Sequence, residues 1–382
     1  NPTMNYYLES LGCPKNLVDA QGMARLLKHL GYNPVADRRQ AQILIVNTCG
    51  FIEDARDESV DALRSLAREK RQDQILIAAG CLSQYWGKAL ADTVPGLDAL
   101  LGTRRWSEIG ALISELRRGR AEHPQSYLSL PGETLLAAAG DGPPSARQGA
   151  SAYLKIADGC GSPCSFCAIP LIKGPAVSRP SEAVVQDAID LVSEGVKEIV
   201  LIAQDTTAYG RDQGQQDALP DLVQDILDAS PDLHWLRLMY AYPAYVSPRL
   251  IEVMAGDPRV SHYLDLPLQH AHSDVLRRMK RPANLEGTRK LVSDLRAPMP
   301  DLALRSSFIV GYPGETEGEF QALLDFVEET RFDRMGVFLF SPEEGTVAAT
   351  LPGRVPQEAK TERYDRLMAL QQQISLELNE AQ

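Results

Sequence analysis

The feature that most constrains the fold is a repeated unit near the N-terminus, in which a short apolar run is followed by helix-like sequence. The three runs are NYYLESLGC, AQILIVNTCG and QILIAAGC, all within the first 81 residues. Continuous apolar strands that alternate with helices are typical of a parallel sheet covered by helices on both faces. The pattern therefore predicts a doubly wound α/β domain over residues 1–120.

Each of these three units ends at a cysteine. Cys13, Cys49 and Cys81 lie 36 and 32 positions apart in the chain. Because parallel strands all end at the same edge of a sheet, we expect the three thiols to emerge on neighbouring loops there. Taken one at a time, each cysteine could equally be a small buried core residue.

A second alternating pattern runs from residue 151 to residue 355. Six apolar runs, of which the first is AYLKIADGC and the last RMGVFLFSP, alternate with helical sequence near 181–194, 219–229, 248–256, 273–296 and 316–329. Six strand-helix units predict an open or partial (β/α) barrel. The chemistry of such a barrel is expected at the C-terminal ends of its strands.

Two further segments complete the predicted organisation. Residues 121–150 lose periodicity and are rich in Gly, Pro and Ser, which predicts a linker or surface loop. Residues 356–382 are amphipathic and predict a C-terminal helix, which runs to the last residue without a stop signal. We therefore expect a chain that has been cut.

Composition limits the class of protein. Of the 382 residues, 44% are hydrophobic, and no apolar run or N-terminal leader indicates a membrane span or a signal peptide. The sequence predicts a cytoplasmic protein, so its six cysteines are expected to be ligands, catalysts or core residues and not disulfides. The net charge of -12 argues against an extended nucleic-acid footprint and suits a basic protein partner.

The most specific motif is the cysteine cluster in ADGCGSPCSFCAIP. Cys160, Cys164 and Cys167 have the spacing Cys-x3-Cys-x2-Cys, which is typical of iron-sulfur ligands. A structural zinc site normally has four protein ligands, and a thioredoxin-like pair would leave Cys160 without a role. Three ligands on a four-iron cluster leave one iron open to a small molecule. The three cysteines at the strand ends favour a second cluster of the same kind.

The cysteine loop, with Phe166 just before the last cysteine, resembles the signature of radical S-adenosylmethionine (SAM) enzymes. The segments SLGCPKN, VNTCGFIEDA, LPLQHA and FIVGYPGETE resemble, in addition, the radical SAM methylthiotransferase family. This resemblance covers nearly the whole chain and is greatest to the branch that modifies a ribosomal protein. It implies a partial-barrel radical SAM domain that holds a [4Fe–4S] cluster on Cys160, Cys164 and Cys167. The open iron would chelate SAM, which an electron from the cluster cleaves to a radical.

The resemblance also implies an auxiliary [4Fe–4S] cluster on Cys13, Cys49 and Cys81, which carries a sulfur atom. One SAM would methylate that sulfur, and a second would give the radical that abstracts hydrogen from the β-carbon of an aspartate in a small-subunit ribosomal protein. An electron donor such as a flavodoxin or ferredoxin is implied. The family ends in a small β-rich TRAM domain, for which this chain shows no segment after residue 382.

Several side chains of the predicted barrel are candidates for the SAM site. They are Phe166, Gln204, Arg305 and Glu315, with Asp205 beside them at a strand end. Strand ends favour ligand-facing roles in such barrels, although each polar group could equally be a satisfied structural one. His270 and His272 could suggest a metal pair, but polar packing is the simpler interpretation.

Two other targets and roles are open at this stage. With the same chemistry, the enzyme could act on an adenosine of tRNA, and the basic run at 276–282 with Arg104 and Arg105 would then be the RNA contact. A protein that uses metal only to staple or to sense would need closed centres. Three cysteines in each set argue against this last interpretation, because they leave irons open.

Overall fold

The computed structural model describes residues 4–119, 125–128 and 145–381. The chain forms two compact units, of which the first comprises Asn1–Gly161 and Ile169–Leu191 and the second Ser162–Ala168 and Val192–Gln382. Most of the predicted linker over 121–150 lies outside the described residues. Within the described ranges, no helix combines the length and apolar character that crossing a bilayer requires.

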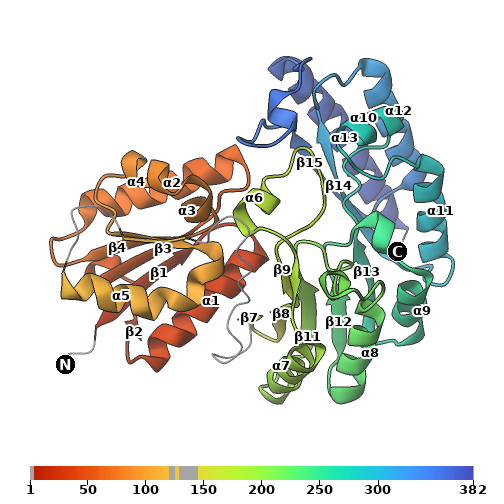
Figure 1. The fold of residues 1–382 in the computed structure, drawn as a ribbon. Helices are drawn as coiled ribbons and strands as arrows, with labels where there is room; N and C mark the ends of the chain where they lie inside the picture. The colour runs from red at the N-terminus through yellow and green to blue at the C-terminus, as the bar shows by residue number, and fades with distance from the viewer. Residues whose placement is uncertain (1–3, 120–124, 129–144, 382) are drawn as a thin grey trace. The chain divides into compact units, whose positions relative to one another are not determined.

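The first unit is built on a six-stranded parallel sheet with the order β2-β1-β3-β4-β5-β6 (Figure 1). Its strands are β1 (Asn5–Ser10), β2 (Asn33–Pro34), β3 (Ile43–Thr48), β4 (Ile75–Gly80), β5 (Ala99–Gly102) and β6 (Gln125–Tyr127). β3 and β4 are buried along their whole length, which explains their continuous apolar sequence. The strand order reverses between β1 and β3, and in open α/β sheets ligands bind at such a switch point.

Helices cover both faces of this sheet (Figure 1). They are α1 (Pro14–His29), α2 (Glu53–Glu69), α3 (Cys81–Trp86), α4 (Lys88–Thr93) and α5 (Ile109–Arg118). Ile45 faces a core layer with α1 and α5, whereas its neighbour Leu44 faces a layer with α2 and α4. The doubly wound domain expected from the sequence is confirmed.

Four short strands and two helices complete the first unit. The strands β7 (Ser145–Gln148) and β8 (Ser151–Lys155) form an antiparallel pair, as do β9 (Ala157–Asp158) and β10 (Val177–Ser178). The helices are α6 (Ile169–Lys173), which packs against α3, and α7 (Ser181–Ser193). The packing of α6 on α3 places the C-terminal end of α6 close to Cys81.

The second unit contains five parallel strands, each paired with the next in chain order. They are β11 (Glu198–Ile202), β12 (Trp235–Leu238), β13 (Val260–Asp265), β14 (Ala303–Val310) and β15 (Arg334–Leu339). The intervening helices are α8 (Leu219–Ala229), α9 (Pro248–Gly256), α10 (Ser273–Arg278), α11 (Leu285–Arg296) and α12 (Glu317–Thr330). The C-terminal helix α13 (Gln357–Glu380) packs on β15 and α12. This is the strand-helix alternation expected of a partial barrel.

One expectation about the helices is wrong. The sequence suggested a single helix near 273–296, but α10 ends at Arg278 and α11 begins at Leu285. Lys280 adopts a left-handed backbone with φ of 54°, and Pro282 follows it. Proline cannot donate a helical hydrogen bond and disfavours helical backbone before it, so the helix stops. Asn284 then caps α11 by accepting a hydrogen bond from the backbone N–H of Gly287.

Candidate functional site

The three strand-end cysteines of the first unit lie on adjoining loops. Cys13 precedes α1, Cys49 follows β3, and Cys81 is the first residue of α3. A methyl group on Gly12 would lie 2.8 Å from both Cβ and Sγ of Cys49, so only glycine allows this approach. A methyl group on Gly50 would lie 2.9 Å from the backbone of Leu82. The edge of the sheet at the switch point thus brings the loops that carry the three cysteines together, as the sequence suggested.

Buried asparagines fix the backbone around these cysteines. The Nδ2 amide of Asn16 donates to the carbonyls of Leu11 (3.0 Å) and Thr48 (2.8 Å), and that of Asn47 donates to the carbonyl of Asn16 (2.7 Å). The hydroxyl of Ser59 accepts from the N–H of Cys49 at 3.0 Å. These residues were not singled out from the sequence, because their partners are brought together only by the sheet.

The thiols of Cys49 and Cys81 are buried, at 9% and 6% exposure. Burial raises the pKa of Cys49, and it raises the pKa of Cys81 to about 12, although the Lys173 cation acts in the opposite direction. The Cys81 thiol donates to Asn16 Oδ1 at 3.4 Å. A cation that replaces this proton would remove the cost of a buried thiolate, so the site suits a metal centre.

The donor set also favours a cluster over a single ion. All six cysteines lie in the described ranges, and none is joined to another by a disulfide. In the part of the chain that the structure describes, no cysteine belongs to a group whose ligand atoms could all reach one ion. A four-iron cluster is larger than one ion and is held by cysteine thiolates, so three spaced thiols fit it.

A network of buried charges lies beside Cys81 in the first unit. The ammonium of Lys173 is 3.1 Å from Asp158 and 3.6 Å from Asp19, and that of Lys155 is paired with Asp19 and lies 3.5 Å from Asp158. Burial opposes ionisation of Asp158, but the two lysines outweigh it and lower the pKa of that carboxyl. Burial likewise opposes the charge on Lys173, and the two aspartates outweigh it and raise its pKa. Asp19 is 136 positions from Lys155, so the sequence gives no local signal that these two residues meet.

Cys160, Cys164 and Cys167 share the short loop between β9 and α6. In the first unit, Gly159 has φ of 75°, and a methyl group there would lie 2.1 Å from the carbonyl oxygen of Pro175. The N–H of Cys160 donates to the carbonyl of Gly174 at 3.1 Å. The loop therefore needs glycine at 159 to fold back on the segment after α6.

The rest of this loop is held by the second unit. The N–H of Ser165 donates to the carbonyl of Met279 (3.0 Å), and its hydroxyl donates to that of Arg278 (2.8 Å). Phe166 is half-buried against a hydrophobic cluster that includes Met279 and Tyr312. Phe166, a candidate from the sequence, thus packs in the core next to the cysteines.

Gln204 and Asp205, the two polar candidates at the end of β11, have buried side-chain atoms without a hydrogen-bond partner among the described residues. Neither amide atom of Gln204 has a hydrogen-bond partner in the described ranges, although both are buried. Oδ1 of Asp205 accepts from the Thr207 hydroxyl (2.6 Å) and the Ala208 N–H (3.2 Å), while Oδ2 is buried without a partner. Burial raises the pKa of Asp205. Buried polar groups are normally paired, so these atoms suit a polar ligand.

The other two polar candidates are placed differently. Glu315 is buried, and its Oε1 accepts from Arg363 Nη1 (2.7 Å) and from the Gly311 N–H (3.0 Å). Arg305 lies on β14 with its side chain 41% exposed, 3.8 Å from Asp265. Among the described residues, no hydrogen bond or ion pair joins the four predicted SAM-site residues Phe166, Gln204, Arg305 and Glu315 to one another.

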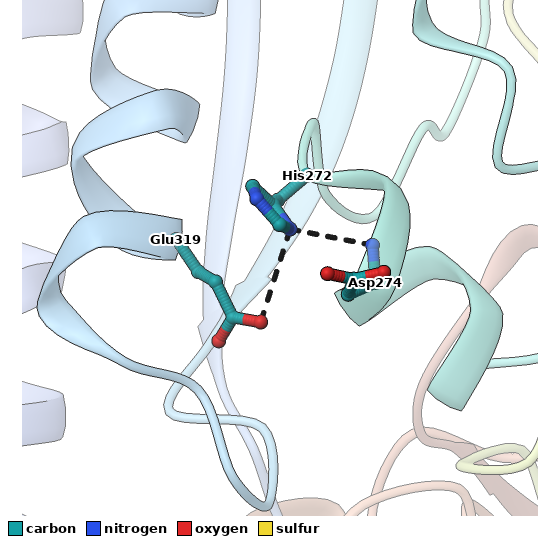
Figure 2. Close-up of side chains that lie close together, drawn as sticks. All are labelled: His272, Asp274 and Glu319. Carbon is teal, nitrogen blue, oxygen red and sulfur yellow. Dashed lines mark hydrogen bonds and ion pairs between the residues drawn. The ribbon is translucent and has the colours of Figure 1, made fainter.

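The histidines after β13 do not form a metal pair. Nε2 of His270 lies 3.3 Å from Glu315, whereas Nδ1 of His272 caps α10 by accepting from the N–H of Asp274 at 3.3 Å. Figure 2 shows His272 between Asp274 and Glu319. Both oxygens of Glu319 are paired with Arg278 at 3.0 Å. The polar-packing interpretation accounts for these contacts.

The basic run at 276–282 does not form an open patch of arginines. Arg277 is paired with Asp274, Arg278 with Glu319, and Arg281 lies against Cys164 and Tyr242. Arg104 is buried and donates to the carbonyl of Pro175 at 2.7 Å. The RNA surface considered from the sequence finds no support in these positions.

Comparison with known proteins identifies the class. A family described as Uncharacterized protein family UPF0004 matches residues 5–102, and the Radical SAM superfamily matches residues 154–327. The fold resembles that of the radical SAM methyltransferase TsrM from Kitasatospora setae, with a TM-score of 0.61 and 15% identity over 88% of this chain and 75% of that chain. The fold and its cysteine loop define a radical SAM enzyme.

The relatives with higher identity define the family more closely. Proteins named ribosomal protein uS12 methylthiotransferase RimO are 46% identical in Roseiflexus sp. (strain RS-1), over 98% of this chain and 83% of that protein, and 45% identical in Moorella thermoacetica, over 97% and 84%. The chain belongs to the RimO family of radical SAM methylthiotransferases. Its cofactors are accordingly two [4Fe–4S] clusters and SAM.

Proposed function

We propose that this enzyme adds a methylthio group to the β-carbon of an aspartate in ribosomal protein uS12, in two SAM-dependent steps with sulfur delivered through the auxiliary cluster. The observation that carries the proposal is the collection of Cys13, Cys49 and Cys81 at the switch point of the first sheet. A radical SAM enzyme that only cleaves SAM has no need of this second set. The names of the relatives and the acidic net charge of -12 support a basic ribosomal protein as substrate.

In this proposal, residues 1–120 hold the auxiliary cluster and residues 151–355 the radical SAM cluster. Residues 121–150 connect them and also contribute the strands β6 and β7, and residues 356–382 form the C-terminal helix. When bound, the clusters and SAM supply the methylthio group and a radical able to remove hydrogen from an unactivated carbon. Such a carbon has no acidic proton, so a general base would have no role. A flavodoxin or ferredoxin would supply the electrons, in the cytoplasm.

The protein's own contribution is positioning. Asn16 and Asn47 fix the backbone of the loops that carry the strand-end cysteines. The carbonyls of Arg278 and Met279 accept hydrogen bonds from Ser165 and fix it in the cysteine loop. Gln204, at the end of β11, offers both an amide donor and a carbonyl acceptor to SAM. In this proposal the chain holds its ligands in place without taking part in proton transfer.

Iron analysis tests the ligand assignment. After anaerobic reconstitution we expect about eight irons per chain, and about four in the variant with Cys160, Cys164 and Cys167 replaced by alanine. The matched variant with alanine at Cys13, Cys49 and Cys81 should also retain about four. Neither variant should methylthiolate uS12. About four irons in the unaltered chain, falling to none in the first variant, would make the strand-end cysteines core residues and end the proposal.

Mass spectrometry tests the substrate. In cells that lack the gene, the aspartate of uS12 should lose the mass of one methylthio group, and this mass should return when the gene is restored. Methylthiolated adenosine in tRNA should be unaffected. The opposite result, with altered tRNA nucleosides and unaltered uS12, would assign the enzyme to tRNA.

Replacement of Gln204 tests its assignment to SAM. Gln204→Leu should weaken SAM binding by about tenfold, since a buried amide loses its ligand partners. Equilibrium dialysis of the iron-loaded protein would measure the dissociation constant. Gln186→Leu, on the exposed face of α7 where the Gln186 amide donates to Asp190 at 2.9 Å, is the matched control. Equal dissociation constants for both variants would remove Gln204 from the site.

A further inference from the structure

Arg281 lies in the segment that separates α10 from α11, where the helix is interrupted. Its backbone N–H donates to the carbonyl of Leu276 at 2.8 Å, and the neighbouring carbonyls of Arg278 and Met279 accept hydrogen bonds from Ser165. The segment therefore contacts the cysteine loop through its backbone, next to the position from which the Arg281 side chain extends. This arrangement depends on the left-handed backbone of Lys280.

The guanidinium of Arg281 makes three direct contacts within the described ranges, and Asp205 acts on it electrostatically from a greater distance. One N–H lies 3.7 Å from Sγ of Cys164, another donates to the carbonyl oxygen of Pro267, and the Tyr242 ring lies beneath it at 4.2 Å from its centroid. The planar fork of the guanidinium is thereby fixed on one face by an aromatic ring and at one end by a carbonyl. A group held in this way loses little entropy when it donates to sulfur.

Arg281 differs from the arginines around it in having no carboxylate partner. Arg277 and Arg278, only a few positions away, are paired with Asp274 and Glu319. Within the described ranges, no carboxylate oxygen comes within ion-pair distance of Arg281, and its Nε is buried without a hydrogen-bond partner. A half-buried cation without an anion is costly. Asp205 acts on Arg281 only beyond ion-pair distance, so the sulfur of Cys164 is the candidate for a negative charge in direct contact.

We propose that Arg281 is a positioning residue that sets the reduction potential of the radical SAM cluster, through an N–H···S hydrogen bond and its positive charge at Cys164. Reduction adds negative charge to a cluster, so a fixed cation and a hydrogen bond to a ligand sulfur stabilise the reduced form. Arginine stays charged at every accessible pH, which makes the effect permanent. This inference rests on the proposed assignment of Cys164 as a cluster ligand.

The Tyr242 ring extends to a second arginine that provides a control. Tyr242 packs on Tyr245 at 5.1 Å between centroids, and Arg211 lies 3.9 Å from the Tyr245 ring. Arg211 thus resembles Arg281 in chemistry and in aromatic contact, but it donates to the carbonyl of Gln216 and to no cysteine. Its replacement should leave the cluster unaffected.

The test is a potentiometric titration, followed by electron paramagnetic resonance without SAM. The chain used carries alanine at Cys13, Cys49 and Cys81, so that only the radical cluster contributes. We expect Arg281→Met to lower the equilibrium constant for one-electron reduction of the cluster by about tenfold. This corresponds to a reduction potential that is about 59 mV more negative. Arg281→Lys, which keeps the charge, should lower the reduction potential by less than half as much. Arg211→Met should leave the reduction potential unchanged.

The outcomes separate this inference from the proposed function. If the background chain does not hold about four irons, the assignment of Cys164 fails and this inference fails with it. If it holds them and Arg281→Met leaves the potential unchanged, only the role of Arg281 is overturned, even if SAM then binds more weakly. If Arg281→Met takes up no iron, Arg281→Gln is titrated in its place and the same shift is expected. If Arg281→Lys is the one variant of the three that takes up iron, the result supports the role of the positive charge. If none of the three variants takes up iron, Arg281 has a purely structural role.

Discussion

Lys173→Met should lower the free energy of unfolding of the first unit by about 3–5 kcal/mol, because among the described residues it leaves Lys155 as the one lysine paired with two buried carboxylates, Asp19 and Asp158. The Lys173 side chain is 2% exposed and lies between Asp19 and Asp158, 3.6 and 3.1 Å away. Methionine matches its length but cannot neutralise either acid. Urea unfolding of the metal-free protein would measure the loss. Trp86 and Trp106 are both in the first unit, so a Trp235→Phe background makes tryptophan fluorescence specific to it.

Two controls define this effect. Lys290→Met removes an exposed pair with Asp294 and should cost less than about 0.5 kcal/mol. Adding Asp158→Asn to Lys173→Met should restore part of the stability, since the excess negative charge in the buried network is then absent.

The pH dependence gives a further check. Because the folded-state pKa of Asp158 is lowered, the contribution of its carboxylate to stability is complete above the ordinary aspartate pKa of about 3.9 and is lost in acid. The difference between the two proteins should therefore narrow below that pH. A loss under about 1 kcal/mol at neutral pH would contradict the role of the network.

Alkylation of Cys81 in the metal-free folded protein should be at least about 100-fold slower than that of Cys13 at pH 8. Burial raises the pKa of Cys81 to about 12, so only about one molecule in ten thousand carries the reactive thiolate at that pH. Cys13 is less buried than Cys81. Timed treatment with iodoacetamide, followed by mass spectrometry of the tryptic peptides, would give the two rates.

The control for this measurement is the unfolded chain. In guanidinium chloride the two cysteines should react at rates within a few-fold of each other, because the burial of Cys81 is lost. Similar rates in the folded protein would show that Cys81 is accessible and ionised without metal. The thiol of Cys81 would then be ionised before any iron binds.

The sequence was sufficient where a local pattern has a local cause. Cys13, Cys49 and Cys81 could be placed at one sheet edge because each follows an apolar strand, and parallel strands end together. The six strands of the second pattern followed from their apolar runs in the same way. Short strands such as β2 and β6 carry too few residues to show a period, and they were missed.

The rest depends on contacts between distant parts of the chain. Lys155 and Asp19 are 136 positions apart, and no sequence pattern indicates that they meet. The break between α10 and α11 was missed because its apolar periodicity continues across Pro282, although the proline itself was a signal. The role of Arg281 follows from that break, since an uninterrupted helix would direct the side chain elsewhere.

The strand order of the first sheet also governs when its metal site can exist. The cysteines that follow β1, β3 and β4 meet only after three strand-helix units have paired in parallel, which is slow because the contacts are remote in sequence. Cys160, Cys164 and Cys167, by contrast, are neighbours in the chain and need no strand pairing to come together. Under the proposed ligand assignment, iron loading of the first site would report a completed fold, and a newly made chain that misfolds there would retain only its second centre.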